Sequence, residues 1–403
     1  MAVRAGARGT RRAWRLAVAG LCLLLVPPLT GCGARGAGDT AQAQVQRVLD
    51  RRAAALLHHD ETAYDATGSR TQYARLTALP LASWRYRVTT VHRGSAGATA
   101  DTELDYRVAG YDTVPVSVRR TVTLGRTADG AWYVTGDRPA GASGQQLWDQ
   151  GPLTAFKGAH SLVLGAGQNS GELRTYARLA DRAVPAVSGA WGTDWTRRVV
   201  VLVPRTLDGM AGLLGAPASD YRGIAAVTTG EAGGSGQAPA DRVVVNPEAY
   251  VALGGTGKQV VLTHETTHVA TRAHTTAATP LWLSEGYADW IGYLGTGRTP
   301  TEAAPELARA VQDGQTPAQL PSDKAFGFTS DPTRLAQAYE GGWLACRMIA
   351  DQWGQARLGA FYRSVGTHRQ RPGAVEAALK KVLGTTPKEF TARWRAYVRA
   401  QLT

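Results

Sequence analysis

One five-residue segment constrains the fold of this chain more than any other: it reads HETTH and runs from His264 to His268 inside an apolar stretch. On a helix, side chains four residues apart share one face, so the two imidazoles can bind a single metal ion. Glu265 follows the first histidine, where its carboxylate can take a proton from a water on that metal. The alternative is a buried helix whose histidines only pack. The segment therefore predicts a helix that carries half of a metal site.

The first 32 residues predict a targeting segment rather than part of the fold. Five arginines, with no acidic residue among them, precede an apolar run from Leu16 to Val26. This run is short for a membrane span, which favours a signal peptide. Leu29-Thr30-Gly31-Cys32 resembles the bacterial lipobox, which implies cleavage before Cys32 and lipidation of its thiol. We therefore expect a chain anchored by lipid to the extracytoplasmic side of the cell membrane; an ordinary secretory signal is the alternative.

Cysteine usage agrees with export. Of the three cysteines, Cys22 and Cys32 belong to the leader, and only Cys346 remains. A single cysteine cannot form an internal disulfide, so the exported fold must depend on its core. Cys346 lies in an apolar helical pattern, which indicates a core residue rather than a nucleophile.

The chain carries an excess of positive charge that is not concentrated anywhere. The formal net charge of +13 falls to +8 without the five leader arginines. The remaining excess is spread along the chain rather than clustered with aromatic residues. It suits a surface near anionic lipid or cell-wall polymer, and it does not predict a nucleic-acid partner.

The order of sequence patterns predicts two domains and an α+β fold. Residues 33–40 are small and polar, as in a tether, and 41–136 carry an amphipathic helix followed by alternating strands from Trp84. This pattern resembles the NTF2-like or cystatin-like modules, each a helix packed on an antiparallel sheet. Residues 137–158 are rich in Gly, Pro, Ser and Gln, which predicts a linker. We expect the second domain, 159–403, to hold a small mixed sheet, the HETTH helix and a mostly helical C-terminal part.

Two residues compete to be the third metal ligand. With His274 the sequence nearly fits the metzincin pattern HExxHxxGxxH. That family needs a glycine where Thr271 stands, because the helix must turn sharply there, and it needs a Met-turn. The only methionine after the motif is Met348, which lies in a helical pattern. These departures argue against His274.

Glu285 is the second candidate. Thr279-Pro280 predicts the start of a helix that continues through Glu285 to Trp290. If this helix packs on the HETTH helix, Glu285 completes a site of two histidines and one glutamate with an open water position. Asp289, one turn later, can accept a hydrogen bond from a ligating imidazole; the alternative is a solvated helix face.

Two further segments resemble the gluzincin metallopeptidases, in particular the M1 aminopeptidases and their peptidase MA-like relatives. WLSEGYA, which contains Glu285, is similar to the WLNEGFA segment whose Glu binds zinc. Tyr339-Glu340-Gly341-Gly342 is similar to the YEKG segment whose Tyr donates to the developing oxyanion, although Gly341 replaces the Lys. The resemblance implies a thermolysin-like domain, one Zn²⁺, and a catalytic role for Tyr339.

The sequence departs from the M1 pattern where substrate is recognised. No GxMEN segment precedes HETTH, and in M1 enzymes this segment recognises the free amino terminus of the substrate. The resemblance therefore implies hydrolysis but leaves endo- versus aminopeptidase activity open. The side-chain preference, the role of the N-terminal domain and the oligomeric state also stay open.

Together these features predict a membrane-anchored zinc metallopeptidase whose partners are a peptide or protein substrate and the membrane. Its predicted metal ligands are His264, His268 and Glu285, and Glu265 is the predicted general base. Residues 241–246, just before the motif, are expected to form an edge strand that pairs with an extended substrate. Two alternatives remain: a non-catalytic lipoprotein with a structural or vestigial zinc site, and a metzincin-type peptidase that uses His274.

Overall fold

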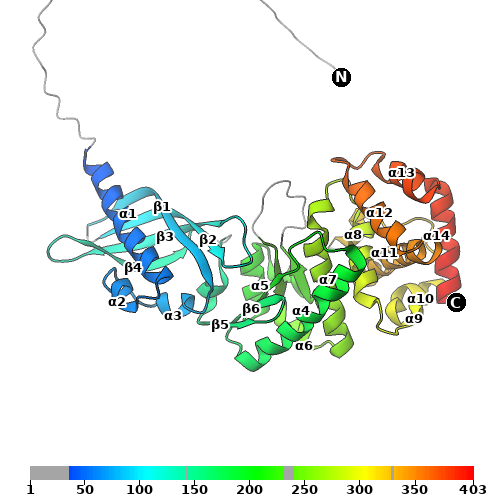
Figure 1. Cartoon of the computed structure of the whole chain (residues 1–403), viewed down its shortest axis with the longest axis horizontal. Coiled ribbons are helices and arrows are strands. Elements are labelled where there is room, and N and C mark those ends of the chain that lie inside the picture. The colour runs from blue at the N-terminus through cyan, green and yellow to red at the C-terminus, as the bar shows by residue number, and fades with distance from the viewer. Residues whose placement is uncertain (1–35, 96, 142–143, 230–239, 328–330) are drawn as a thin grey trace, which may run out of the picture.

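The computed structural model describes residues 36–95, 97–141, 144–229, 240–327 and 331–403. They form an elongated molecule in which an N-terminal module, a central sheet and a group of C-terminal helices follow one another along the long axis (Figure 1). Two sheets and many helices make this an α+β protein, as predicted. No helix in these ranges is long and apolar enough to cross a membrane. The predicted signal peptide and Cys32 lie outside the described residues.

The N-terminal module consists of three helices and an antiparallel meander in the order β1-β2-β3-β4. Alternate side chains of β2 are buried, which is the pattern of a strand with one face on a core. The long helix α1 covers that face with Val45, Val48 and Leu49. Residues 36–40, predicted to be a tether, belong to α1 instead. The elements are α1 (Gly36–Leu57), α2 (Glu61–Asp65), α3 (Tyr73–Leu76), β1 (Leu81–Arg93), β2 (Gly97–Val108), β3 (Val116–Arg126) and β4 (Trp132–Pro139).

The prediction of a linker at 137–158 needs correction, because most of this segment is built into the structure. It contains the end of β4, a 3₁₀ turn at Leu147–Gln150 and strand β5 (Leu153–Lys157). Leu147 and Trp148 are buried in the core that the N-terminal module shares with the central sheet. Both guanidinium Nη atoms of the fully buried Arg120 donate to the Asp149 carboxylate at 2.8 Å. Composition alone misses these tertiary contacts.

The central sheet has the strand order β5-β6-β7-β9-β8. The three inner strands β6, β7 and β9 are parallel, and β5 and β8 are antiparallel to their neighbours. Residues 241–246 were expected to form an edge strand, and this is wrong: β9 lies between β7 and β8, and β8 is the edge. The run Val243–Val245 is buried on both faces, as is typical of an inner strand. The strands are β6 (Ser161–Ala166), β7 (Val199–Val203), β8 (Ala226–Thr228) and β9 (Arg242–Val245).

The two faces of the central sheet pack against different parts of the chain. On one face, Val199, Val201 and Val243 contact α4 (Ser170–Trp191) and Leu262 of α7 (Gly255–Thr271). On the other, Leu162, Leu164 and Val200 join the core of the N-terminal module. The short helices α5 (Leu207–Leu214) and α6 (Pro247–Val251) complete this part. The module is therefore packed directly on the sheet that carries the HETTH helix.

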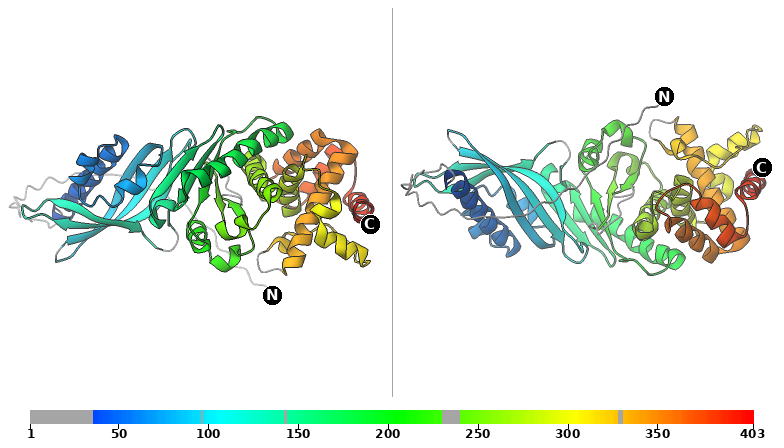
Figure 2. Two further views of the ribbon diagram at one scale, coloured as in Figure 1. Left: turned by 90° about the horizontal axis from the view of Figure 1, so that it is seen from below. Right: turned by 90° about the horizontal axis from the view of Figure 1, so that it is seen from above.

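The C-terminal helices surround α8 (Leu281–Tyr293) and α11 (Pro332–Trp353), which approach each other closely. Gly286 and Gly342 allow this approach, because a Cβ on Gly286 would lie 2.2 Å from the carbonyl oxygen of Gly342. Cys346 and Met348 of α11 are fully buried, and burial raises the pKa of the Cys346 thiol well above its usual value. Both views in Figure 2 show these helices at the end opposite to the N-terminal module. The others are α9 (Pro300–Ala303), α10 (Pro305–Gln312), α12 (Gln355–Gly366), α13 (Ala374–Ala378) and α14 (Pro387–Leu402).

Candidate metal centre

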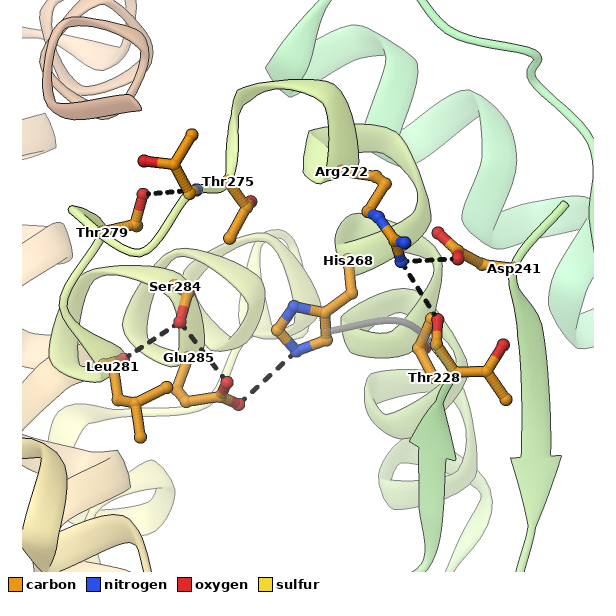
Figure 3. Close-up of a pocket in the computed structure, with 11 residues that line it drawn as sticks. Thr228, Asp241, His268, Arg272, Thr275, Thr279, Leu281, Ser284 and Glu285 are labelled. Carbon is orange, nitrogen blue, oxygen red and sulfur yellow. Dashed lines mark hydrogen bonds and ion pairs between the residues drawn. The ribbon is translucent and has the colours of Figure 1, made fainter. Parts of the chain in front are cut away.

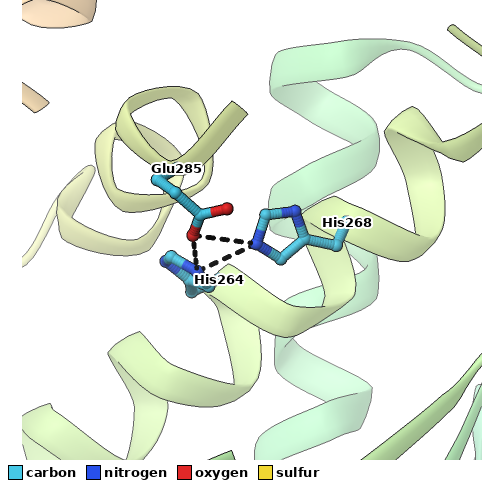
Figure 4. Close-up of side chains that lie close together, drawn as sticks. All are labelled: His264, His268 and Glu285. Carbon is cyan, nitrogen blue, oxygen red and sulfur yellow. Dashed lines mark hydrogen bonds and ion pairs between the residues drawn. The ribbon is translucent and has the colours of Figure 1, made fainter. Parts of the chain in front are cut away.

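The structure brings three predicted ligands together from two helices. α7 presents His264 and His268 on one face, and α8 packs across it and presents Glu285 (Figure 4). The two Nε2 atoms are 3.0 Å apart, and Oε2 of Glu285 lies 3.2 Å from His264 Nε2 and 3.4 Å from His268 Nε2. Glu285 and His268 are buried and His264 is nearly so. Two imidazole nitrogens and a carboxylate oxygen therefore converge on one small space.

These separations fit a zinc ion. Zinc binds imidazole nitrogen and carboxylate oxygen at about 2.0–2.2 Å with tetrahedral angles, so adjacent ligand atoms should be roughly 3.3–3.6 Å apart. The observed distances of 3.0, 3.2 and 3.4 Å reach the lower end of that range, so a small outward shift of the side chains would accommodate the ion. Across the described parts of the chain, these three residues form the only group of His, Cys, Asp or Glu side chains with metal-binding spacing. Three protein ligands would leave one position for water or substrate, as catalytic sites do.

Asp289 orients the first ligand. Nδ1 of His264 donates to the Asp289 carboxylate at 2.8 Å, which leaves the lone pair on Nε2, the atom that faces the other ligands. Burial alone would lower the pKa of His264, but the neighbouring carboxylates of Asp289 and Glu285 raise it to about 10. Burial would raise the pKa of Glu285, yet the two imidazoles hold it well below its usual value. The cluster thus favours a cation at its centre.

Glu265, the predicted general base, is held by the edge strand of the central sheet. Its carboxylate is buried and accepts a hydrogen bond of 2.6 Å from the hydroxyl of Thr228, the last residue of β8. The same hydroxyl lies 3.1 Å from the backbone oxygen of Glu265. The edge strand and the HETTH helix are therefore joined at the residue that would move the proton.

Tyr339, the predicted oxyanion donor, lies on α11 beside the site. Its ring centroid is 6.4 Å from that of His264, and its other side packs on Phe326 at 5.1 Å. The side chain is half-buried rather than enclosed in the core. The close α8–α11 contact places Glu285 and Tyr339 in the same neighbourhood.

The alternative third ligand, His274, does not join the group. Thr271 keeps a helical conformation (φ −84°, ψ −8°), and the chain continues into a 3₁₀ turn at Arg272–His274. The imidazole of His274 packs edge-on against Trp191 at 5.5 Å. The metzincin-type arrangement is therefore not formed, because the helix lacks the sharp turn that would bring this histidine back.

A pocket next to the ligands contains residues that the sequence did not single out (Figure 3). It is lined by His268 and Glu285, by several threonines and by Arg272. Nη1 of Arg272 donates to Asp241 at 2.7 Å. Because Arg272 follows His268 by four residues, the sequence could have predicted that its side chain lies on the same helix face as the ligands. Thr228 had no such signal, because its contact depends on the order of strands in the sheet.

Comparison with known proteins finds only distant similarity. No protein-family model and no curated protein sequence matches this chain. Among solved structures, native yeast LTA4 hydrolase matches with a TM-score of 0.37 and 13% identity, over 61% of this chain and 39% of that chain. An M1 zinc metallopeptidase from Deinococcus radiodurans matches with a TM-score of 0.35 and 13% identity, over 79% of this chain and 93% of that chain. A variant M1 zinc metallopeptidase from the same organism, bound to a Tyr-Ser-Ala substrate, matches with a TM-score of 0.34 and 13% identity, over 82% and 96%. Similarity at this level assigns no activity to the chain.

Proposed function

We propose that this chain is a zinc-dependent metallopeptidase that hydrolyses peptide bonds outside the cytoplasm. One observation carries the proposal: two imidazoles and a carboxylate meet at 3.0–3.4 Å, and a buried glutamate adjoins them. A purely structural zinc site has no use for a general base beside its ligands. The position of Glu265 therefore favours catalysis over a structural or vestigial site.

Each residue at the metal centre has a separate role in the proposed hydrolysis. When bound by His264, His268 and Glu285, zinc would polarise the scissile carbonyl and make water more acidic. Glu265 accepts the proton of the attacking water and returns it to the leaving amine. The hydrogen bond from Thr228 restrains the Glu265 carboxylate, so that its orientation is set before substrate arrives.

Two further elements suit a peptide substrate. Tyr339 would donate its hydroxyl to the oxyanion that forms when water adds to the carbonyl. Strand β8 is a sheet edge that ends at Thr228, so an extended peptide can pair with it as an added strand. This role replaces the one expected for residues 241–246.

Lipidation of Cys32 would hold the N-terminal module against the outer face of the membrane, because α1 begins at Gly36. Cells that express the full chain should incorporate labelled fatty acid into the protein and retain it in the membrane fraction. The Cys32→Ser variant should lose both properties. Unchanged labelling in that variant would contradict the anchor.

The enzymatic proposal is tested with the purified full-length chain and Glu265→Gln. The wild type should contain about one zinc per chain by elemental analysis and should cleave peptides, as followed by mass spectrometry. Glu265→Gln should retain zinc and lose at least about 100-fold in rate, since general-base catalysis contributes that much. Glu376→Gln, at an exposed position on α13, is the matched control and should behave as wild type. Zinc binding without any cleavage, and an unchanged Glu265→Gln profile, would refute the enzyme.

A second comparison separates the enzyme from a non-catalytic zinc protein. Tyr339→Phe should keep zinc and lower kcat by about 100-fold if the hydroxyl stabilises the oxyanion. Removing zinc with a chelator should abolish activity while leaving most of the fold, since a structural site would unfold without its metal. Unfolding scans with and without chelator measure this difference.

A further inference from the structure

The pocket at the metal centre adjoins a much larger cavity. The two share Asp241, Arg272, Thr275 and Thr276, so they lie side by side with these residues between them. The larger part has a volume of about 810 Å³. We call the combined hollow the long groove. It begins at the ligands His268 and Glu285 and ends at the N-terminal module.

The far end of the long groove is made by two parts of the chain that are distant in sequence. Tyr111 and Thr113 belong to the turn between β2 and β3 of the N-terminal module. The opposite wall includes His368 and Arg369, which follow α12. A substrate that extends from the metal along this groove would therefore touch the N-terminal module.

Arg272 stands where the two parts of the groove meet. It follows His268 by one helical turn, so it faces the same side as the ligands. Its side chain is 23% exposed, and Nη1 donates to Asp241 at 2.7 Å and to the Thr229 carbonyl oxygen at 3.4 Å. In the described part of the chain these bonds involve Nη1 alone, and a guanidinium has five N–H groups. Nε and Nη2 have no hydrogen-bond partner among the described residues, so they can serve a ligand in the groove.

In the larger part of the groove, three arginines stand against two acidic residues. Arg198 and Arg369 line it together with Arg272, and two acidic residues, Asp194 and Asp241, also line it. Asp241 restrains Arg272 and neutralises part of its charge, and Asp194 offsets one of the two exposed arginines, so an excess of one positive charge remains. A guanidinium held in one orientation matches a carboxylate by paired hydrogen bonds.

The N-terminal module fixes the strand that restrains Arg272. The side chain of Asp112 is fully buried and accepts from the backbone N–H of Ala240 at 3.1 Å and from Nη2 of Arg242 at 2.8 Å. Arg242, the first residue of β9, bonds to the module, while Asp241 directly before it lines the groove. The module thus forms the far wall of the groove and also positions Asp241.

We propose that the long groove binds the part of a peptide substrate that extends from the scissile bond, and that Arg272 selects a carboxylate in that part. The carboxylate is either an acidic side chain or the C-terminus of the peptide. The proposal rests on the peptidase function above. Arg272 is then a residue that determines specificity, and the N-terminal module contributes to substrate binding as well as to the fold.

Three fluorescent decapeptides of otherwise equal sequence test the proposal. One has a central Glu and an amidated C-terminus, one has Gln and a free C-terminus, and one has Gln and an amidated C-terminus. Binding is measured by fluorescence anisotropy on the zinc-loaded full-length Glu265→Gln protein, which binds without cleaving. One of the first two peptides should bind about tenfold more tightly than the third, as expected for a charge-assisted pair. Which one it is identifies the source of the carboxylate.

Variants at the groove complete the test. In the same background, Arg272→Gln should remove the preference. The double change Asp241→Asn with Arg272→Gln should do so without leaving an unpaired carboxylate. Arg309→Gln, on α10 outside the groove, is the control and should keep the preference. Equal affinities for the three peptides, or a preference that survives in the double variant, would overturn the inference.

The outcome separates this inference from the proposed function. Cleavage by the wild-type chain without any preference for a carboxylate would remove the role of Arg272 and leave the peptidase intact. A preference that depends on Arg272 in a chain that cleaves nothing would support the groove and refute the peptidase.

Discussion

Replacing Gly286 by alanine should damage the metal centre without touching any ligand. Gly286 follows Glu285 on α8 and lies against the backbone of α11. An added Cβ would sit 2.2 Å from the carbonyl oxygen of Gly342 and 2.9 Å from the backbone nitrogen of Trp343. Both neighbours are backbone atoms, so no side chain can rotate away. The two helices must separate by roughly 1 Å to restore normal contact.

The size of the effect follows from that displacement. Overpacking a core contact costs about 1–3 kcal/mol, and a contact between two helix backbones should lie at the upper end. Metal–ligand distances tolerate about ±0.2 Å, so a shift of this size removes Glu285 from effective coordination. We expect Gly286→Ala to unfold more easily by about 3 kcal/mol and to bind zinc at least about 100-fold more weakly.

The assays are denaturant unfolding of the full-length chain and competition for zinc with a fluorescent chelator. Gly189→Ala is the matched control, because Gly189 lies in helix α4 and its added Cβ would meet no atom within 4 Å. That change should stabilise the protein by up to about 1 kcal/mol. Wild-type zinc affinity in Gly286→Ala would refute the idea that the α8–α11 contact positions Glu285.

Three further changes test other parts of the structure. Asp289→Asn should weaken zinc binding 10- to 100-fold in the chelator assay, because it removes the carboxylate that orients His264; exposed Asp313→Asn should have no effect. Burial raises the pKa of Glu340 to about 7, so the folded state binds this proton more tightly than the unfolded state does, and stability should fall as pH rises from about 4.5 to 7. Glu340→Gln should therefore match the wild type at pH 5 and exceed it at pH 8 by up to about 3 kcal/mol in denaturant unfolding; equal stability at pH 8 would contradict this. Arg120→Leu should cost about 3–5 kcal/mol, because it leaves Asp137 and Asp149 buried without their partner, whereas exposed Arg119→Leu should cost little.

Much of the local structure was accessible from the sequence. Alternation from Trp84 predicted the strands of the N-terminal module, and residues 241–246 were expected to be a strand, which is β9. Thr279-Pro280 predicted the start of α8, which begins at Leu281. These features depend on neighbours in the chain, so periodicity and capping residues reveal them.

The wrong linker prediction shows that local composition does not reveal tertiary contacts. The composition of 137–158 is that of a flexible segment, yet Trp148 fills the space between two sheets and Asp149 balances the charge of buried Arg120. Both partners are far away in sequence. Local composition therefore cannot predict these contacts.

For the metal centre, the sequence by itself determined the face that His264 and His268 share and the presence of Glu265 beside them, because helical geometry relates residues four apart. The sequence also favoured Glu285 over His274, through Thr271 and the WLSEGYA segment, but only the tertiary structure brings Glu285 to the two histidines, since that depends on how α8 packs on α7. The tertiary structure also decided that Thr228 of the edge strand holds Glu265, and that the N-terminal module closes the long groove. These arrangements follow from strand order and helix contacts, which join residues that no local pattern connects.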